Sequence, residues 1–294
     1  MLIKPFLKWA GGKGQLLNKI RPLYPQGLGN QITKYIEPFI GGGAVFFDII
    51  SSYKLNKYII NDINKELINT YKAIQQDIHS LLEYLSKITS YYKKLSTEER
   101  DLFYYNIRDK YNSIVLNNCI NLEKAALFIF LNKTCFNGLY RVNRNNQFNV
   151  PAGKYKDPAI YDEENLLNVS KLLQNIEILC GDFATTYNYI DSNTFIYIDP
   201  PYRPLTKTSS FTNYSNYIFD DNEQVRLSSF INEADKKGAY VLASNSDPKN
   251  TSENDVFFDE LYSSKKIIRI EATRAINSNP LKRGKINELL ISNY

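Results

Sequence analysis

The sequence predicts an α/β protein built on a mostly parallel sheet that helices cover on both faces. Short β-rich apolar runs recur along the chain and end in acids or glycines, and helical patterns lie between several of them. Near-continuous apolar strands that alternate with helices are typical of parallel sheets buried on both faces. Such sheets bind ligands at the carboxyl ends of their strands.

Five strands of this sheet are expected from the apolar runs. They are residues 34–39, 57–62, 176–182, 194–199 and 239–244. Helical patterns follow the first two runs, as GAVFFDIISSY and NKELINTYKAIQQ. Strands alternating with helices in this way favour parallel pairing over a chain of hairpins.

Residues 73–160 interrupt the alternation. Three helical patterns follow one another there (DIHSLLEYLSKI, EERDLFYYNIRDKY and LEKAALFIFLNK), and then comes the loop-rich stretch TCFNGLYRVNRNNQFNVPAGKYKDP. We predict a helical insertion between the second and third strands, with a basic, aromatic and Asn-rich tip. The sheet domain is then expected to comprise residues 1–72 and 161–294.

Composition narrows the class of protein. The chain has 294 residues, of which 23% are charged and 43% hydrophobic, as in an ordinary globular protein. No apolar run approaches the roughly 20 residues that cross a bilayer. The N-terminal MLIKPFLKWAGGK also lacks the features of a signal peptide. We therefore expect an intracellular, cytoplasmic protein without a membrane segment.

The cysteines and the single histidine argue against a metal site. Cys119, Cys135 and Cys180 are odd in number and far apart, which favours reduced, partly buried thiols over a disulfide framework or a zinc knuckle. His79 lies in a helical stretch and is expected at the surface or half-buried. No metal site and no histidine-based triad are predicted.

Positive charge is concentrated in three segments. Residues 1–21 carry +5, residues 131–160 carry +4 and residues 263–285 carry +6, so the rest of the chain carries −10 against a total of +5. Segregation of this kind fits a side that faces a polyanion and an acidic back. Three unrelated solvated patches fit the charges equally well.

A glycine loop follows the first predicted strand. In YIEPFIGGGAVFFDI, Gly41, Gly42 and Gly43 permit a tight turn and a close approach of a ligand to the helix N-terminus. Asp62 follows 19 residues after Gly43 and closes the next strand, an offset at which a carboxylate can accept both hydroxyls of a ribose.

The loop lacks the marks of a pyrophosphate site. Phe46 and Phe47 stand where the dinucleotide pattern needs a third glycine, and no Gly-Lys-Ser/Thr follows a strand. A cofactor that contains adenosine but no pyrophosphate fits best. NAD, a nucleotide and S-adenosylmethionine stay open on spacing alone, as does a purely structural glycine turn.

The fourth predicted strand ends in Asp199-Pro200-Pro201-Tyr202. Proline fixes φ at about −65° and removes an N–H, so the turn presents carbonyls without competing donors. Asp199 and the Pro200 carbonyl can each accept one N–H of an amino group on a planar ring, and Tyr202 offers a flat face. Such a grip localises the lone pair of the nitrogen, so methyl transfer from a sulfonium needs alignment rather than a strong base. An ordinary strand-to-loop turn is the alternative.

At these motifs the chain resembles Dam-type N6-adenine DNA methyltransferases, of the group in which the cofactor loop precedes the target-recognition insert and the catalytic tetrapeptide comes last. The resemblance runs nearly from end to end. The matching segments are FLKWAGGK (6–13), EPFIGGGAVF (37–46), NDINKELI (61–68), FNGLYRVNRNNQFNVPAGKY (136–155), GDF (181–183), DPPYRPL (199–205), SSFTNY (209–214), SNS (244–246) and KINELLISNY (285–294).

The resemblance implies a class I, Rossmann-like methyltransferase sheet of seven strands, with residues 73–160 as the target-recognition domain. It also implies methyl transfer from S-adenosylmethionine to N6 of a flipped adenine in double-stranded DNA, within GATC. Asp199, Pro200 and Tyr202 would be catalytic, and Tyr202 would stack on the target base. The implied cofactor contacts are Trp9, Lys13 (methionine carboxylate), Glu37, Phe39, Gly41, Gly43, Asp62 (ribose), Asp182 (adenine edge), Phe183 and Asp199.

Base flipping costs a few kcal/mol, and stacking on an aromatic ring returns about 1–3 kcal/mol per base. The tip of the insertion has the residue types of a duplex reader, with cations for guanine or phosphate and apolar groups for thymine methyls. A loop that contacts only phosphates is the alternative. The expected DNA contacts are Lys8, Phe136, Asn137, Leu139, Arg141, Asn149, Pro151, Lys154, and Lys282 and Arg283 of a basic C-terminal hairpin.

Other readings of the motifs stay open. The same chemistry would serve RNA, another GAT-containing site or a glutamine amide of a protein, and a second class is a DNA-binding module without catalysis. The segment RPLTKTSSFTNYSNYIFDD is expected to close over the site. The resemblance implies a monomer, with a restriction endonuclease as a functional rather than a stable partner.

Overall fold

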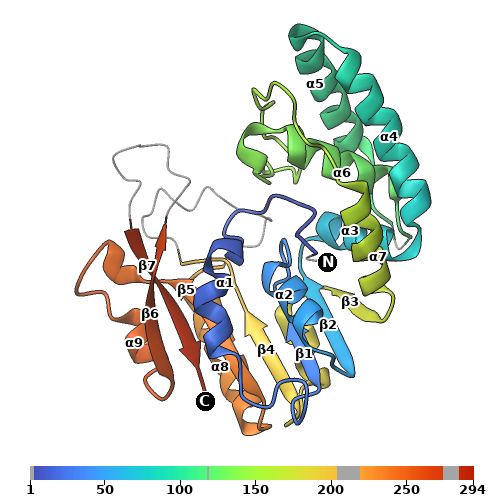
Figure 1. Ribbon diagram of the computed structural model, residues 1–294. Helices are drawn as coiled ribbons and strands as arrows, with labels where there is room; N and C mark the ends of the chain where they lie inside the picture. Colours follow the sequence, from blue (N-terminus) through green and yellow to red (C-terminus); the bar gives the residue numbers. More distant parts are fainter. Residues whose placement is uncertain (1–2, 118, 204–218, 274–284) are drawn as a thin grey trace.

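The computed structural model describes residues 3–117, 119–203, 219–273 and 285–294. A twisted sheet with helices on both faces lies beside a group of helices, and the chain begins between the two (Figure 1). The expected positions of Lys282 and Arg283, and most of the segment expected to close over the site, fall outside the described residues.

The sheet has seven strands in the order β3-β2-β1-β4-β5-β7-β6. The five expected strands are confirmed and pair in parallel, and β7 pairs antiparallel with β5 and with β6. The strands are β1 (Lys34–Glu37), β2 (Lys57–Asp62), β3 (Ile176–Cys180), β4 (Thr194–Ile198), β5 (Tyr240–Ser246), β6 (Lys266–Thr273) and β7 (Lys285–Ser292). The resemblance implied a methyltransferase sheet of seven strands, and this is confirmed.

Alternation along the strands divides the core into two layers, because successive side chains point to opposite faces of a sheet. On one face Ile36, Ile196 and Ile198 pack with α8 (Asp221–Lys236) and α9 (Phe257–Leu261). On the other face Tyr35 and Phe195 pack with the remaining helices of the sheet part. These are α1 (Leu17–Ile20), α2 (Ala44–Ser52), α3 (Lys65–Gln76) and α7 (Glu163–Leu173).

The helical group is formed by α4 (Ile78–Lys94), α5 (Thr97–Ser113) and α6 (Leu122–Thr134), where three helices were expected. Residues 124–132 of α6 are all buried, because α3, α4 and α5 pack around it. Ser96 and Glu99 form a capping box at the start of α5. One hydrophobic cluster continues from the sheet through α3 into α6, and the division at residues 72 and 161 stays a prediction.

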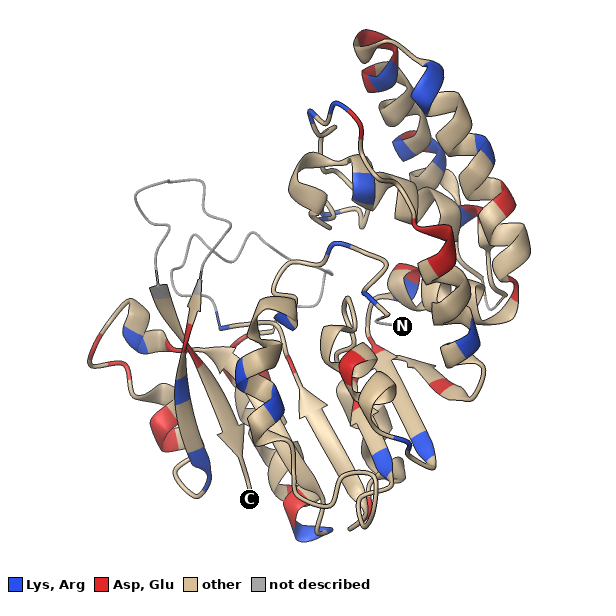
Figure 2. Ribbon diagram, viewed as in Figure 1, with Lys and Arg blue, Asp and Glu red and all other residues tan. Residues whose placement is uncertain are grey.

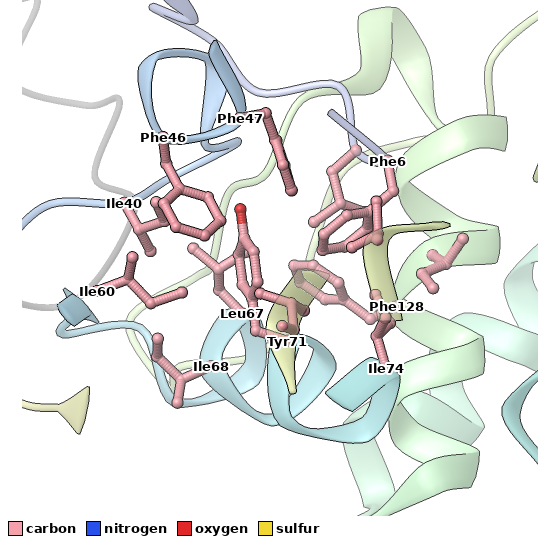
Figure 3. Close-up of a cluster of buried hydrophobic side chains, with 14 of the residues drawn as sticks. Phe6, Ile40, Phe46, Phe47, Ile60, Leu67, Ile68, Tyr71, Ile74 and Phe128 are labelled. Carbon is pink, nitrogen blue, oxygen red and sulfur yellow. The ribbon is translucent and has the colours of Figure 1, made fainter. Parts of the chain in front are cut away.

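Tyr71 of α3 contacts the glycine loop from the hydrophobic core. Its ring packs edge-on against Phe6, with 4.9 Å between the ring centroids, among the apolar side chains of Figure 3. Its hydroxyl donates to the Gly41 carbonyl at 3.1 Å. A side chain at Gly43, where φ is +73°, would place a Cβ 2.7 Å from that hydroxyl. The loop is therefore fixed against the core.

The structure corrects the expected burial of the cysteines. Cys135 is buried, but Cys119 and Cys180 are exposed and not partly buried. Cys180 ends β3, which is the outermost strand on its side of the sheet, so no neighbouring strand covers it. His79 is exposed, as one of its two expected positions. In the described ranges, no helix is both long and apolar enough to cross a membrane.

Some of the basic residues are already paired in the structure. Basic and acidic residues are mixed over the sheet and the helical group (Figure 2). Part of the positive charge counted along the chain is neutralised in ion pairs. The basic residues that each contact a carboxylate are Lys13, Arg21, Lys265 and Arg269. Among the described residues, a basic side and separate solvated patches both stay open as interpretations of the charge pattern.

Candidate active site

Asp199 lies at the carboxyl end of β4, between β1 and β5 in the middle of the sheet. The ammonium of Lys13 approaches its two carboxylate oxygens at 2.7 and 2.8 Å, and also donates to the Gly11 carbonyl at 2.8 Å. The Lys13 side chain is 3% exposed and that of Asp199 is 20% exposed. The acid is thus held in a fixed position while one side stays accessible.

The next strand provides a second support for this acid. The hydroxyl of Ser244, near the end of β5, donates to Asp199 Oδ1 at 2.8 Å. Gln224 of α8 donates to the Pro201 carbonyl at 3.2 Å and accepts from Asn245 at 3.1 Å. Sequence reasoning assigned no role to these three polar side chains, although Ser244 ends a predicted strand beside β4 and could have been found from that.

Tyr202 is held at both ends of its side chain. The Lys13 ammonium lies 4.7 Å from the centroid of its ring, and its hydroxyl donates to Glu288 Oε2 at 2.8 Å. Burial, together with the charges of Asp199 and Glu288, raises the pKa of Tyr202 well above its usual value. Tyr202 therefore acts as a neutral phenol and a hydrogen-bond donor.

The glycine loop and Asp62 meet as predicted. Asp62 accepts from the backbone N–H groups of Gly41 and Asn64, both at 3.0 Å, which orients its carboxylate at the end of β2. Burial raises the pKa of Asp62 to about 6, against these two hydrogen bonds. Trp9 covers the loop so closely that a Cβ at Gly41 or Gly42 would lie 2.8 or 2.9 Å from its side chain.

Asn61 ties the ends of three strands together. This buried side chain donates to the carbonyls of Pro38, after β1, and Gly181, after β3, at 3.0 and 2.9 Å. The loops that carry Phe39, Asp62 and Asp182 are therefore joined at one edge of the sheet. Sequence reasoning did not assign a role to Asn61, whose position just before Asp62 was the available signal.

Asp182 is paired rather than free. Arg226 of α8 donates to both of its oxygens, at 2.9 and 2.6 Å, and these hydrogen bonds lower the pKa of Asp182. The same guanidinium lies 4.0 Å from the ring centroid of Phe183, which packs against Phe39 at 5.5 Å. Asp182 and two aromatic rings thus form one unit, and Arg226 is a member that the sequence did not indicate.

Glu37 lies deeper than the other predicted cofactor residues. It is 3% exposed and accepts from the Tyr35 hydroxyl at 2.6 Å. Burial raises the pKa of Glu37 well above its usual range, and the nearby charge of Asp199 adds to the rise. A proton on Glu37 relieves the repulsion between these two acids.

Lys8 joins the tip of the insertion to the N-terminal segment. Its backbone exchanges two hydrogen bonds of 2.8 Å with the side chain of Asn132, and its stem lies where a Cβ of Gly138 would come within 2.4 Å. Asn137, just before that glycine, has a φ of +56°. Lys8 thus lies against the turn that carries Asn137 and Leu139.

Arg141 and Asn149 lie together across a short hairpin. The Arg141 guanidinium donates to the Asn149 side-chain oxygen at 2.8 Å and to its carbonyl at 3.3 Å. Phe136 is 51% exposed, an unusual position for a large apolar ring. Pro151 and Lys154 are exposed and Leu139 is partly buried, so the predicted reading residues lie at the surface of the insertion.

The polar groups at the carboxyl edge fit S-adenosylmethionine. Asp62 offers carboxylate oxygens for ribose hydroxyls, Asp182 offers acceptors for an adenine amino group, and Phe39 offers an apolar ring face. Lys13 is the cation suited to a carboxylate, although here it is paired with Asp199. Trp9, the remaining aromatic neighbour, stacks on Tyr140 with 5.7 Å between the ring centroids.

Comparisons with known proteins show the family of the chain. The family model described as D12 class N6 adenine-specific DNA methyltransferase matches residues 9–276. The type II methyltransferase M.MjaIII of Methanocaldococcus jannaschii is 50% identical over the whole of both chains. The type II methyltransferase M1.LlaDCHI of Lactococcus lactis subsp. cremoris is 39% identical, covering 99% of this chain and 96% of its own.

A DNA adenine methylase of Haemophilus influenzae is 35% identical, and the alignment covers 98% of this chain and 92% of that protein. Enzymes of this kind use S-adenosylmethionine as methyl donor, in accord with the groups found at the sheet edge. The chain belongs to the D12 class of N6 adenine-specific DNA methyltransferases.

Proposed function

We propose that this enzyme methylates N6 of an adenine that has left the double helix, and that the adenine lies within GATC. The observation that carries the proposal is the fixed Asp199 carboxylate, bound by Lys13 and Ser244 and flanked by the Tyr202 ring. Because an amino group inside a duplex is out of reach, the base must be extruded. S-adenosylmethionine, when bound, supplies the methyl group as a sulfonium.

Asp199 and the Pro200 carbonyl act on the amino group of the extruded base. Each accepts one N–H, which draws the nitrogen towards tetrahedral geometry and localises its lone pair. Lys13 and Ser244 keep the carboxylate from rotating, so little reorganisation is left for the transition state. Tyr202 stacks on the purine, a contact worth about 1–3 kcal/mol, and so offsets part of the cost of flipping.

The proposed cofactor site lies beside this acid on the same sheet edge. Asp62 binds the ribose, Asp182 the adenine edge and Lys13 the methionine carboxylate, with Trp9, Glu37, Phe39, Gly41, Gly43 and Phe183 completing the site. The Asp62 and Asp182 carboxylates are already oriented by hydrogen bonds, which supports their use as fixed acceptors. A preordered site loses less entropy on binding.

We assign base reading to residues 73–160 as a target-recognition domain. Arg141 is the proposed guanine contact, and its pairing with Asn149 supports the role because a guanidinium held at one edge presents its other donors in a defined direction. Lys8, Asn137, Leu139 and Pro151 are proposed to contact the remaining bases. Phe136 is proposed to fill the space that the adenine leaves, and Lys154 to contact guanine or phosphate.

The names of the relatives support a proposal about cellular role. Their names as type II methyltransferases support a role that protects DNA from a partner restriction endonuclease. We propose that the enzyme acts as a monomer and forms no stable complex with that nuclease.

The test is to express the chain in cells that lack adenine methylation and to map modified adenines across the genome. Modification confined to GATC is expected. Modification at GATC together with other GAT-containing sites would contradict the assigned site, and methylated cytosines without methylated adenines would contradict the chemistry. In vitro, Arg141→Ala is expected to lose about 1–3 kcal/mol of discrimination at one guanine. A uniform loss of binding to all sequences would make Arg141 a phosphate contact instead.

A further inference from the structure

The C-terminal strand reaches the catalytic tetrapeptide through one side chain. Glu288 lies in the middle of β7, where it is paired in register with Ser246 of β5 and Ile270 of β6. Its Oε2 accepts the Tyr202 hydroxyl at 2.8 Å across 86 residues of sequence. We propose that Glu288 is a positioning residue, which holds the Tyr202 ring in the orientation that stacks on the extruded adenine; this rests on the proposed function of Tyr202.

Two torsions decide where a tyrosine ring points, and the site restrains both ends of the side chain. Tyr202 leaves the backbone directly after two prolines, whose φ angles are fixed. The Lys13 ammonium sits 4.7 Å from its ring centroid, and Glu288 holds the hydroxyl at the far end. Without the second contact, the ring could turn about its first torsion while it stayed near Lys13.

The surroundings of Glu288 indicate that strand packing does not require a carboxylate there. Leu289, Leu290 and Ile291, which follow it on β7, are fully buried and bind the strand into both cores. A half-buried carboxylate is costly unless it is paired. Burial raises the pKa of Glu288, and the nearby Lys13 opposes that rise. Its described hydrogen-bond partner is Tyr202, a residue of the catalytic tetrapeptide. A role in positioning Tyr202 therefore explains why a costly carboxylate is present here.

Lys13 connects this contact to the acid. It binds both oxygens of Asp199 and lies against the Tyr202 ring. The base-gripping carboxylate and the stacking ring are therefore positioned by one ammonium, and Glu288 fixes the end of the ring that Lys13 does not reach. Loss of Glu288 is expected to leave Asp199 in place and to release only the ring.

The test uses the full-length protein and four variants, Glu288→Gln, Glu288→Ala, Tyr202→Phe and Tyr202→Ala, together with the double variant E288A/Y202F. The matched control is Asn287→Ala, the preceding residue on β7. Its exposed side chain points to the opposite face, and its described hydrogen bonds to Asn250 and Asp247 use only its backbone. Thermal melting of each variant identifies a temperature at which all are folded.

The expected result is a split between kcat and KM. Glu288→Ala should lower kcat about 10- to 100-fold, the effect of losing one hydrogen bond to a charged group, while KM for S-adenosylmethionine stays within about twofold. Tyr202→Phe should match it, and E288A/Y202F should be no slower than either single variant. Glu288→Gln should keep most activity, because an amide oxygen also accepts, and Asn287→Ala should resemble the wild type.

A second measurement reports on the ring directly. With 2-aminopurine in place of the target adenine and S-adenosylhomocysteine bound, the fluorescence of the complex with Glu288→Ala should move towards that with Tyr202→Ala. The role of Glu288 would be overturned, while that of Tyr202 stands, by either of two results. One is a kcat of the double variant that falls by the product of the two single effects. The other is fluorescence that Y202A alters and E288A leaves unchanged. If Tyr202→Ala changes neither kcat nor fluorescence, the stacking role of Tyr202 fails, and the inference fails with it.

Discussion

Replacing Asp199 by asparagine tests the chemistry with little change of shape. The wild-type carboxylate is bound by Lys13 at 2.7 and 2.8 Å and by Ser244 at 2.8 Å. Asparagine removes the negative charge and replaces one acceptor oxygen by an NH2 group, which faces a donor where the carboxylate accepted. Removal of one preorganised electrostatic group costs about 2.7–4 kcal/mol in the transition state, so we expect the rate of methyl transfer to fall about 100- to 1,000-fold.

The same change weakens the fold, and this must be separated from catalysis. Loss of one partner of a buried ion pair costs about 3–5 kcal/mol. The cost here should be smaller, about 1–2 kcal/mol, because an amide oxygen still accepts from Lys13 and Asp199 is 20% exposed. For a chain of this length, that corresponds to a fall in Tm of about 2 to 3 °C.

The assay is single-turnover transfer of labelled methyl to a GATC duplex, well below the lowest Tm, with cofactor affinity measured by calorimetry. Asp199→Asn should be slow at a temperature at which it is fully folded and at a cofactor concentration that calorimetry shows to be saturating. A single-turnover rate within about threefold of wild type under these conditions would refute the role of Asp199.

Three further predictions concern the cofactor side of the site. Because Arg226 lowers the pKa of Asp182, this acid contributes stability above its ordinary value of 3.8 that is lost as the pH falls. In Arg226→Ala, the free energy of urea unfolding should depend less on pH in the acid range, and KM for S-adenosylmethionine should rise. An unchanged pH dependence of unfolding would contradict the pairing. Burial raises the pKa of Asp62 to about 6, so ionisation is unfavourable in the free protein. Cofactor affinity, measured by calorimetry, should therefore rise as the pH increases through 6. Asp62→Asn should bind the cofactor more weakly, with an affinity that does not change with pH. A pH dependence that persists in this variant would contradict the prediction. Gly42→Ala should displace Trp9, the one tryptophan of the chain, with a shift in its fluorescence and weaker cofactor binding; an unshifted spectrum would show that the loop yields instead.

The sequence predicted those parts of the fold that depend on local pattern. Apolar runs that end in Glu37, Asp62 and Asp199 marked three adjacent strands, and the parallel order brought their carboxyl ends to one edge. The helices of the insertion were visible for the same reason, since their apolar periodicity is local. The glycine loop and Asp62 meet in the structure because their spacing corresponds to one strand-helix-strand unit.

Contacts that depend on strand order could not be predicted in this way. Glu288 meets Tyr202 because β7 inserts between β5 and β6, an order that no local pattern reveals. Lys13 was assigned to a cofactor carboxylate, and nothing along the chain indicated that it would bridge 186 residues to Asp199. The exposure of Cys180 was missed because β3 could not be recognised as an edge strand without the sheet.

Residues 8–13 connect the sites that we propose for DNA reading, cofactor binding and catalysis. Within this stretch Lys8 lies against the turn at Gly138, Trp9 covers Gly41 and Gly42, and Lys13 binds Asp199. A chain of this length spans at most about 18 Å when fully extended. The three contacts therefore cannot separate by more than that length. The segment has polar anchors at both ends, Asn132 on Lys8 and Asp199 on Lys13. It therefore joins, over six residues, the turn that we propose to read bases and the carboxylate that we propose to bind the adenine amino group.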